Sequence, residues 1–220
     1  MENRIPEIRF YLKRNPYGCF SNFAPYPVVI DGKLWTTTEH YYQAQKFIGT
    51  EYEEKIREVI APFRAKAMAK KEGMPKRKDW FDVKFDVMMI AVKAKFDQHE
   101  NLRDILISTG NAILIEHTEL DLYWGDGGDG SGRSRLGEAL MKIRCSYPEY
   151  DDIFYVPPWK AFSTRRLDSQ FWTEDRGGEY LNKFLNWYGK LSSPARREYD
   201  AYFVMPGKWQ GFREKYGLTT

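Results

Sequence analysis

Apolar side chains recur every three or four residues along most of this chain, which is the spacing of an amphipathic helix. We expect helices at about residues 37–47, 51–59, 64–71, 81–96, 99–108, 136–144, 180–191 and 193–203. Four short stretches are rich in β-branched and aromatic residues and predict strands, at residues 8–12, 28–30, 33–35 and 112–116. The dipeptide Asp31-Gly32 predicts a tight hairpin between the middle two. The pattern therefore predicts a mainly α protein, that is, α+β with a small strand and hairpin component.

The helix expected after residue 35 has the most ordered polar face. Three threonines at residues 36–38 suit a helix N-cap. Polar residues then follow at i, i+3, i+4 and i+7, which places a carboxylate, a phenol, an amide and an amine on one side: Glu39, Tyr42, Gln43 and Lys46. Such a face is either the wall of a pocket or a solvated surface with a hydrogen-bond ladder through Glu39, Gln43 and Lys46.

A compact loop at residues 19–26 sets small polar groups between aromatic rings. In one interpretation Ser21 and Asn22 present hydrogen-bonding groups to a ligand, and rings such as Phe20 shape its pocket. In the other interpretation the rings are core residues, and the Asn22 amide ties the turn together.

The second unusual stretch is the glycine-rich segment, residues 116–137. Five glycines lie between Gly125 and Gly132, directly before the helix expected at residues 136–144. Glycines let backbone amides approach an anion closely, and the start of a helix adds partial positive charge. The segment predicts a phosphate cradle supported by Arg133 and Arg135; the alternative is a flexible turn.

Known nucleotide and metal motifs do not fit the glycine-rich segment. It lacks the Gly-Lys-Ser/Thr of a Walker motif and the surrounding pattern of a Rossmann fingerprint. Its acidic residues lack the twelfth-position Glu of an EF-hand. We predict no metal site.

A basic run at residues 70–78 ends at Asp79-Trp80, just before the longest expected helix. The run is either a solvated loop or a basic rim that attracts phosphate. Trp80 is correspondingly either a core residue or a ring that stacks on a ligand.

Composition limits the class of protein. The 220 residues include seven Trp and fifteen Tyr, with 30% charged residues, which is typical of a folded protein of one domain with an appendage, or of two small domains. The net charge of +3 is too small to indicate nucleic-acid binding by itself. No apolar run is long enough for a membrane span, and residues 1–6 lack an apolar signal region. Two distant cysteines, Cys19 and Cys145, are expected to be free thiols, so we expect a cytoplasmic protein.

Taken together, the separate motifs resemble the NADAR, or YbiA-like, family of N-glycosidases. The resemblance follows the same order over residues 8–147 and rests on residues 18–23, 38–47, 78–80, 123–128, 136–137 and 140–141. It implies a mainly helical NADAR/YbiA-like domain at residues 1–147 that needs no cofactor and hydrolyses the bond between C1 of a ribose and an exocyclic nitrogen. Substrates of the family are ribosylamino-pyrimidine phosphates of riboflavin synthesis and, in other members, guanine carrying ADP-ribose.

The resemblance places the family's functional Glu, Trp and Asp at Glu39, Trp80 and Asp121. Breaking a C1–N bond passes through an oxocarbenium-like state, which a carboxylate stabilises while an acid protonates the nitrogen. Glu39 and Asp121 could divide these tasks, and Trp80 could stack on the base. The expected substrate-binding residues are Phe20, Ser21, Asn22, Tyr42, Gln43, Trp124, Gly125, Asp126, Gly127, Gly128, Arg133 and Arg135.

Lys46 has three possible roles. Its amine could attack C1 and form a Schiff base with the opened ribose, provided that burial lowers its pKa. It could instead pair with Glu39 or contact a phosphate.

Residues 148–220, the extension, lie outside the resemblance and are rich in aromatic residues. We expect this extension to pack on residues 1–147, either as a structural buttress or to admit a larger ADP-ribosylated substrate. The larger substrate could be a nucleic acid, because the extension contains several arginines: Arg165, Arg166, Arg196 and Arg197. The competing function for the whole chain is a module that binds ADP-ribose or a related nucleotide without cleaving it.

Overall fold

The structure, a computed structural model, describes residues 5–218 apart from the side chain of Asp175. Residues 1–4 of the segment predicted to lack a signal region lie outside the described residues. The fold is mainly helical, as predicted, and its helices are α1 (Thr38–Ala44), α2 (Glu51–Arg57), α3 (Pro62–Met68), α4 (Trp80–Gln98), α5 (Glu100–Ile107), α6 (Arg135–Arg144), α7 (Pro158–Ala161), α8 (Asp175–Lys190), α9 (Ser193–Tyr202) and α10 (Phe212–Lys215). Within residues 5–218, no helix is both long and apolar enough to cross a membrane.

Four short strands form two separate pairs. Strands β2 (Val28–Ile30) and β3 (Lys33–Trp35) are antiparallel, and Asp31 and Gly32 between them both have positive φ, 52° and 73°, which confirms the tight hairpin. Strands β1 (Glu7–Phe10) and β4 (Ile113–Glu116) are parallel. Because parallel strands run in the same direction, the chain that follows β1 and the chain that follows β4 leave from the same edge, where His117 N–H donates to Phe10 O at 2.9 Å.

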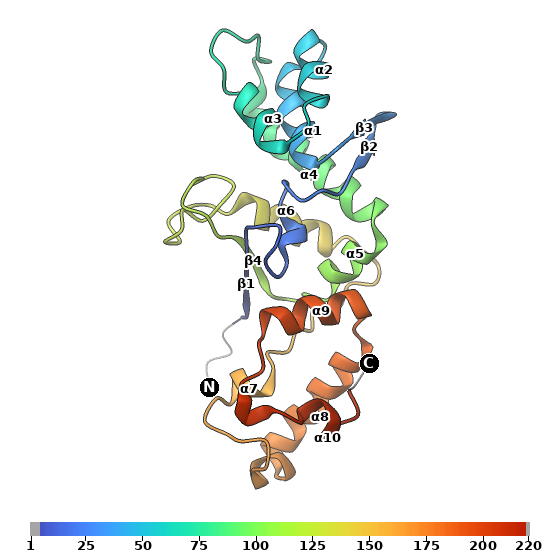
Figure 1. Ribbon diagram of the computed structural model, residues 1–220, viewed down its shortest axis with the longest axis vertical. Coiled ribbons are helices and arrows are strands. Elements are labelled where there is room, and N and C mark those ends of the chain that lie inside the picture. The colour runs from blue at the N-terminus through green and yellow to red at the C-terminus, as the bar shows by residue number, and fades with distance from the viewer. Residues whose placement is uncertain (1–4, 219–220) are drawn as a thin grey trace.

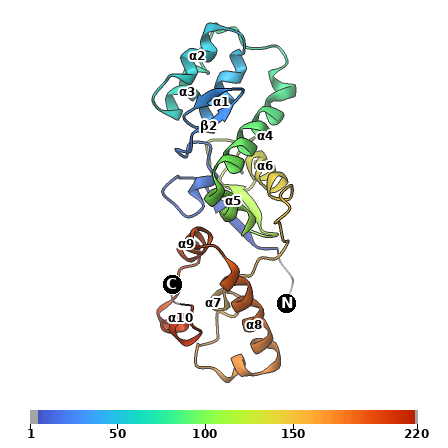
Figure 2. The ribbon, with the colours of Figure 1, turned by 90° about the vertical axis from the view of Figure 1, so that its right-hand side faces the viewer.

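Helix α4 is the centre of the fold (Figures 1 and 2). It packs against α1, α5, α6 and the β2 strand. Helix α6 also lies directly on β4, because a Cβ added at Gly137 would be 1.9 Å from Leu114 O. The backbones of α6 and β4 can therefore approach this closely only because residue 137 is glycine.

One charged residue is fully enclosed in this core. Lys95 of α4 is 1% exposed, and its Nζ donates to the carbonyls of Cys19 and Ser21. Burial lowers the pKa of Lys95 to about 8. The lysine thus fixes the loop that precedes α1 from inside the protein.

The extension packs against the chain around β1. Tyr202 OH donates to Glu7 O at 3.3 Å and accepts from Arg9 N–H at 3.2 Å, while Glu198 accepts from Tyr17 N–H at 2.5 Å. Helix α9 also packs on α5. Inside the extension the aromatic residues form a continuous cluster that includes Trp159, Trp172, Phe184, Trp209 and Phe212. Figure 1 shows α7, α8 and α10 at the end of the molecule opposite α1, α2 and α3.

Candidate active site

Helix α1 begins where the sequence predicts, and it is joined to the preceding loop through Asn22. Thr37 is the N-cap, and its hydroxyl accepts from His40 N–H. Asn22 Oδ1 accepts from the Thr38 hydroxyl at 2.9 Å, and Asn22 O accepts from Glu39 N–H at 3.2 Å. The Asn22 amide also donates to Met88 Sδ at 3.1 Å. These bonds fix the position at which Glu39 leaves the backbone.

The polar face of α1 lines a cavity of about 510 Å³. The chain after β1 (residues 11–13), the loop at residues 21–23, the start of α3, Met88 and the chain after β4 complete its wall. The parallel pairing of β1 and β4 is what brings residues 11–13 beside Thr118 and Asp121. Residues that are distant in sequence therefore enclose the polar face of α1.

Both interpretations of this face hold in part, because the ladder exists but is not solvated. Gln43 Nε2 donates to Glu39 Oε1 at 2.7 Å, and Lys46 Nζ donates to Gln43 Oε1 at 2.6 Å. Glu39 is only 5% exposed. Burial raises the pKa of Glu39 to about 7 and lowers the pKa of Lys46 to about 8, although each group partly offsets the shift of the other.

Two more carboxyl groups line the cavity. Asp121 Oδ1 accepts from the N–H groups of Tyr123 and Trp124 at 2.9 and 2.8 Å, so the loop backbone orients it. Glu116 has no side-chain hydrogen bond within the described residues, and burial together with Asp121 and Glu39 raises its pKa to about 8.

Sequence reasoning did not select Glu116 as a site residue. A signal for it was present, because Glu116 and Leu114 lie two residues apart on β4 and therefore point to the same face. Leu114 is 1% exposed and marks that face as the buried one. A carboxyl group at such a position must either find a partner or have a function.

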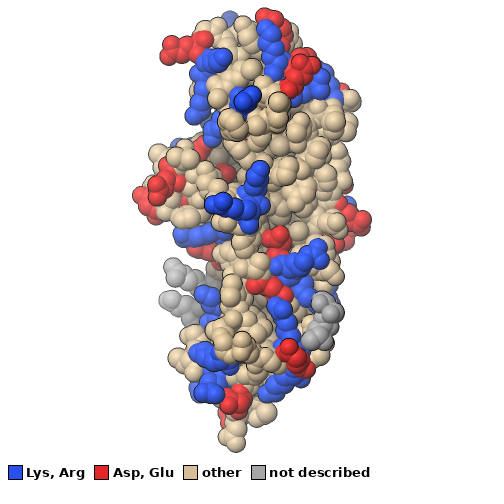
Figure 3. All heavy atoms as spheres, in the orientation of Figure 1, with Lys and Arg blue, Asp and Glu red and all other residues tan. Residues whose placement is uncertain are grey.

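Four lysines line the cavity together with the three carboxyl groups: Lys13, Lys46, Lys66 and Lys70. Of these, the sequence analysis named Lys46 and included Lys70 in the basic run. On the face shown in Figure 3, Lys and Arg side chains lie at the end of the molecule that carries α1, α2 and α3, interspersed with Asp and Glu, and also over the rest of the face. The cavity therefore offers positive charge to an anionic ligand beside carboxyl groups that can exchange protons.

Trp80 is not among the residues that line the cavity, and its stacking on a base stays a prediction. Its ring packs on Tyr42 with centroids 5.0 Å apart, and Lys46 Nζ lies 5.4 Å from its centroid. Trp80 therefore contacts Tyr42 and Lys46, which line the cavity, without lining the cavity itself. Trp124 does line the cavity, and its Nε1 donates to Tyr42 OH at 3.1 Å.

The glycine-rich segment folds around its own carboxylate instead of forming an open cradle. Asp126 Oδ1 accepts from the N–H groups of Thr118 and Gly128, and Oδ2 lies 2.8 Å from His117 Nδ1. Asp126 O accepts from the N–H groups of Gly130 and Gly132. The segment's amide groups are thus largely used internally.

The predicted site residues fall into two groups. The structure brings Ser21, Asn22, Glu39, Tyr42, Gln43, Lys46, Asp121 and Trp124 together around the cavity. Phe20 is a core residue, and Arg135 pairs with Glu138 over the ring of Phe85. The predicted residues outside the cavity wall are Phe20, Trp80, Gly125, Asp126, Gly127, Gly128, Arg133 and Arg135.

No group of three His, Cys, Asp or Glu residues within the described part of the chain is arranged to hold a metal ion. Cys19 is buried and Cys145 is exposed, and both are free thiols. The side chains that line the cavity supply carboxyl groups, amines, amides and aromatic rings.

Comparisons with known proteins agree on one family. The family model of the NADAR domain matches residues 9–146. N-glycosidase YbiA of Escherichia coli is 52% identical over 137 residues, which cover 62% of this chain and 86% of that protein. An N-glycosidase of Nostoc punctiforme is 41% identical over 62% of this chain and 90% of its own length.

A longer relative and a solved structure are also similar to this chain. A riboflavin biosynthesis protein of Vibrio vulnificus is 38% identical over 65% of this chain, but the match covers 39% of that protein. The NMR structure of E. coli YbiA is 51% identical and superposes with a TM-score of 0.60, covering 63% of this chain and 83% of that one.

Proposed function

This chain belongs to the NADAR family, and we propose that it is an N-glycosidase that hydrolyses the bond between C1 of a phosphorylated ribose and a nitrogen atom. Relatives that share about half of the aligned residues bear the name N-glycosidase, which supports a hydrolase acting on N-glycosyl bonds. The observation that carries the proposal is the ladder of Glu39, Gln43 and Lys46, in which Glu39 and Gln43 are buried, and which lines one cavity together with Asp121 and Glu116.

The carboxyl groups suit different steps of hydrolysis. With a pKa of about 7, Glu39 is partly ionised at neutral pH, and its carboxylate stabilises the positive charge that develops at C1. With a pKa of about 8, Glu116 is mostly protonated and can give its proton to the departing nitrogen. Asp121, oriented by two backbone amides, can hold the attacking water.

Proton transfer and attack by water complete the hydrolysis. The C1–N bond breaks as the nitrogen receives the proton of Glu116, and a water oxygen forms a bond to C1. The water gives one proton to the Glu116 carboxylate, which restores the acid. The products are a free amine and a ribose phosphate with a hydroxyl group on C1.

Lys46 offers a covalent route. Its neutral amine can form a bond to C1 while the C1–N bond breaks and the leaving nitrogen takes a proton. The ring then opens when C1 releases the ring oxygen, which is protonated, and a C1=N Schiff base to Lys46 results. Water adds to this bond and releases the ribose phosphate as an aldehyde. Burial, which lowers the pKa of Lys46 to about 8, increases the neutral fraction that this route needs.

Borohydride trapping separates the two routes. If the Schiff base forms, reduction during turnover leaves a covalent ribose phosphate adduct, and peptide mass spectrometry locates it on Lys46. Lys46→Met should abolish the adduct, whereas Lys66→Met, which changes another lysine of the same cavity, should retain it. Hydrolysis that proceeds with no trapped adduct would remove the covalent route.

Two substrate classes fit the charge of the cavity. One is a ribosylamino-pyrimidine phosphate, and the name of the V. vulnificus relative supports riboflavin-related chemistry. The other is ADP-ribose linked to guanine, either free or in a nucleic acid. Both carry phosphate, for which the lysines of the cavity are suitable partners.

One assay tests the proposed function. The protein is incubated separately with each substrate class, and the products are separated by chromatography. Release of the amine or guanine, and its loss in Glu39→Gln, is the expected result. Tight binding of both substrates with no cleavage would contradict the proposal and leave a nucleotide-binding module.

A further inference from the structure

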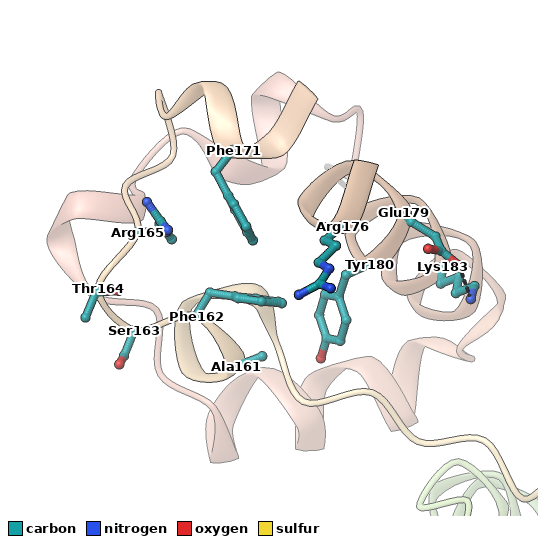
Figure 4. A pocket seen from close by; sticks show the side chains of 10 residues that line it. All are labelled: Ala161, Phe162, Ser163, Thr164, Arg165, Phe171, Arg176, Glu179, Tyr180 and Lys183. Atoms are coloured by element: carbon teal, nitrogen blue, oxygen red, sulfur yellow. Dashed lines mark hydrogen bonds and ion pairs between the residues drawn. The ribbon is translucent and has the colours of Figure 1, made fainter. Parts of the chain in front are cut away.

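A second cavity, of about 600 Å³, lies entirely within the extension (Figure 4). Its walls are the chain at residues 161–165, the ring of Phe171 and one face of α8. It shares no lining residue with the cavity at α1, and Figure 1 shows α8 and α1 at opposite ends of the molecule. It is therefore separate from the candidate active site.

Three aromatic rings form the apolar side of this extension cavity. The ring centroid of Phe162 lies 5.0 Å from that of Phe171 and 5.0 Å from that of Tyr180. Tyr180 OH donates to Val156 O at 2.5 Å, which fixes that ring. Trp172, which is buried, supports Phe162 and Phe171 from behind. The rings are half-buried, so their arrangement is held by packing while part of their surface remains open.

Cationic residues lie on both sides of the rings. Helix α8 presents polar groups at i, i+3, i+4 and i+7: Arg176, Glu179, Tyr180 and Lys183. Glu179 binds Lys183 at 2.6 Å, so the one carboxylate of the cavity wall is already paired. Arg165 and Arg176 form no ion pair with any side chain that the structure describes, and the guanidinium carbon of Arg165 lies 4.7 Å from the centroid of Phe171.

We propose that the extension cavity binds a nucleoside phosphate, either free or as an unpaired nucleotide of a nucleic-acid strand. The base stacks on the Phe162 and Phe171 side of the cavity, and Arg165 and Arg176 bind the phosphate. An apolar ligand would contact the rings but would use neither arginine. An acidic peptide would use the arginines but would not need three converging rings. A phosphorylated aromatic ring system uses both features.

The site can be located directly in the full chain by NMR. AMP should shift the amide signals of residues 161–183, and adenosine or inorganic phosphate alone should shift them at least tenfold less strongly at equal concentration. A short single-stranded oligonucleotide is the second probe. Tighter binding of the oligonucleotide assigns the site to a strand, and equal or weaker binding assigns it to a free nucleotide. Signals of residues 39–46 report separately on the cavity at α1.

Matched variants test the two arginines. Arg165→Gln combined with Arg176→Gln should weaken AMP binding at residues 161–183 at least tenfold. Both residues are exposed, so the remaining spectrum should be unchanged. Arg166→Gln is the control, because Arg166 lies in the same loop but pairs with Asp168 outside the cavity wall. Equal affinity of the double variant and the unchanged protein, or an absence of shifts at residues 161–183, would overturn the proposal.

Discussion

Burial shifts the protonation equilibrium of Glu39 toward its neutral form. The pKa of Glu39 is raised from 4.5 to about 7, so the folded protein binds more protons than the unfolded chain between these two values. Stability is consequently lost as pH rises through this window, with a cost on the order of 3 kcal/mol above it. A carboxylate held at this cost next to Lys46 is a feature of a functional site.

Glu39→Gln should therefore inactivate and stabilise the protein at once. The substituted amide can still accept the hydrogen bond from Gln43 but carries no charge. We expect turnover to fall at least a hundredfold, as is typical when an acid–base group is lost. The free energy of unfolding should rise by about 2–3 kcal/mol at pH 8 and by less than about 1 kcal/mol at pH 5. Urea unfolding at both pH values measures this.

The control for this measurement is Glu72→Gln, because Glu72 is an exposed glutamate. It should change neither turnover nor the pH dependence of stability. Near-normal turnover of Glu39→Gln would rule out its role at C1, and an equal stability change at both pH values would rule out its buried charge as the cause.

Glu116 should be recognised by the alkaline side of the pH profile. A group with a pKa of about 8 that acts as an acid loses its proton above that pH, so kcat/KM should fall there. Glu116→Gln should lose about a hundredfold in kcat and also this alkaline fall. Glu119→Gln, an exposed change in the same segment, should leave the profile unaltered. A variant that is merely less stable and keeps the alkaline fall would show that Glu116 is not the acid.

The residues of α1 were predictable, but their environment was not. The spacing of Glu39, Gln43 and Lys46 defines their common face from local sequence alone. Whether that face is exposed to solvent depends on which residues pack over it. Its covering groups include Lys66 and Glu116, which reach it only through the packing of α3 and the pairing of β1 with β4.

The conformation of short turns and helix starts is predictable from the sequence, but the hydrogen bonds within the glycine-rich segment are not. The hairpin at Asp31-Gly32 and the N-cap of α1 at Thr37 depend on nearest neighbours, and both match the structure. The number of glycines in the glycine-rich segment predicts free backbone N–H groups that could bind a phosphate. Asp126 lies within the same segment and accepts those amides first, which a count of glycines does not reveal.

The close contact between α6 and β4 can be tested by a substitution at Gly137. Gly137→Ala places a methyl group 1.9 Å from Leu114 O unless α6 moves, so the helix must shift away from the strand that carries Glu116. We expect a loss of about 2–4 kcal/mol in stability, comparable with overpacking of a core, and a decrease in kcat. Thermal unfolding and turnover of the same sample measure both.

Gly189→Ala is the matched control for Gly137→Ala. Gly189 also lies in a helix, but a Cβ added there meets nothing within 4 Å. Alanine should therefore stabilise α8 by about 0.5–1 kcal/mol through its higher helix propensity. A similar small gain at Gly137 would mean that α6 does not rest on β4.

For the whole molecule, the extension is the main difference from E. coli YbiA. The aligned 137 residues make up 86% of E. coli YbiA, which leaves little length there for a counterpart of residues 148–220. We propose that residues 1–147 form the catalytic domain and that the extension, packed on it, stabilises one wall of its cavity. The contact runs through the turn after β1, because residues 11–13 line the cavity and Tyr17 bonds to Glu198.

Glu198→Ala tests this coupling without removing the extension. It deletes the acceptor of Tyr17 N–H, and Tyr17 is 1% exposed, so an unpaired amide is left with little access to water. Such a loss costs about 1–3 kcal/mol. Because the same turn carries Lys13 into the cavity, we expect KM to rise severalfold while kcat changes little. Glu214→Ala, at an exposed position of α10, should alter neither quantity. A decrease in melting temperature with unchanged KM would make the extension a support for the fold alone, and unchanged values of both would remove any coupling through Tyr17.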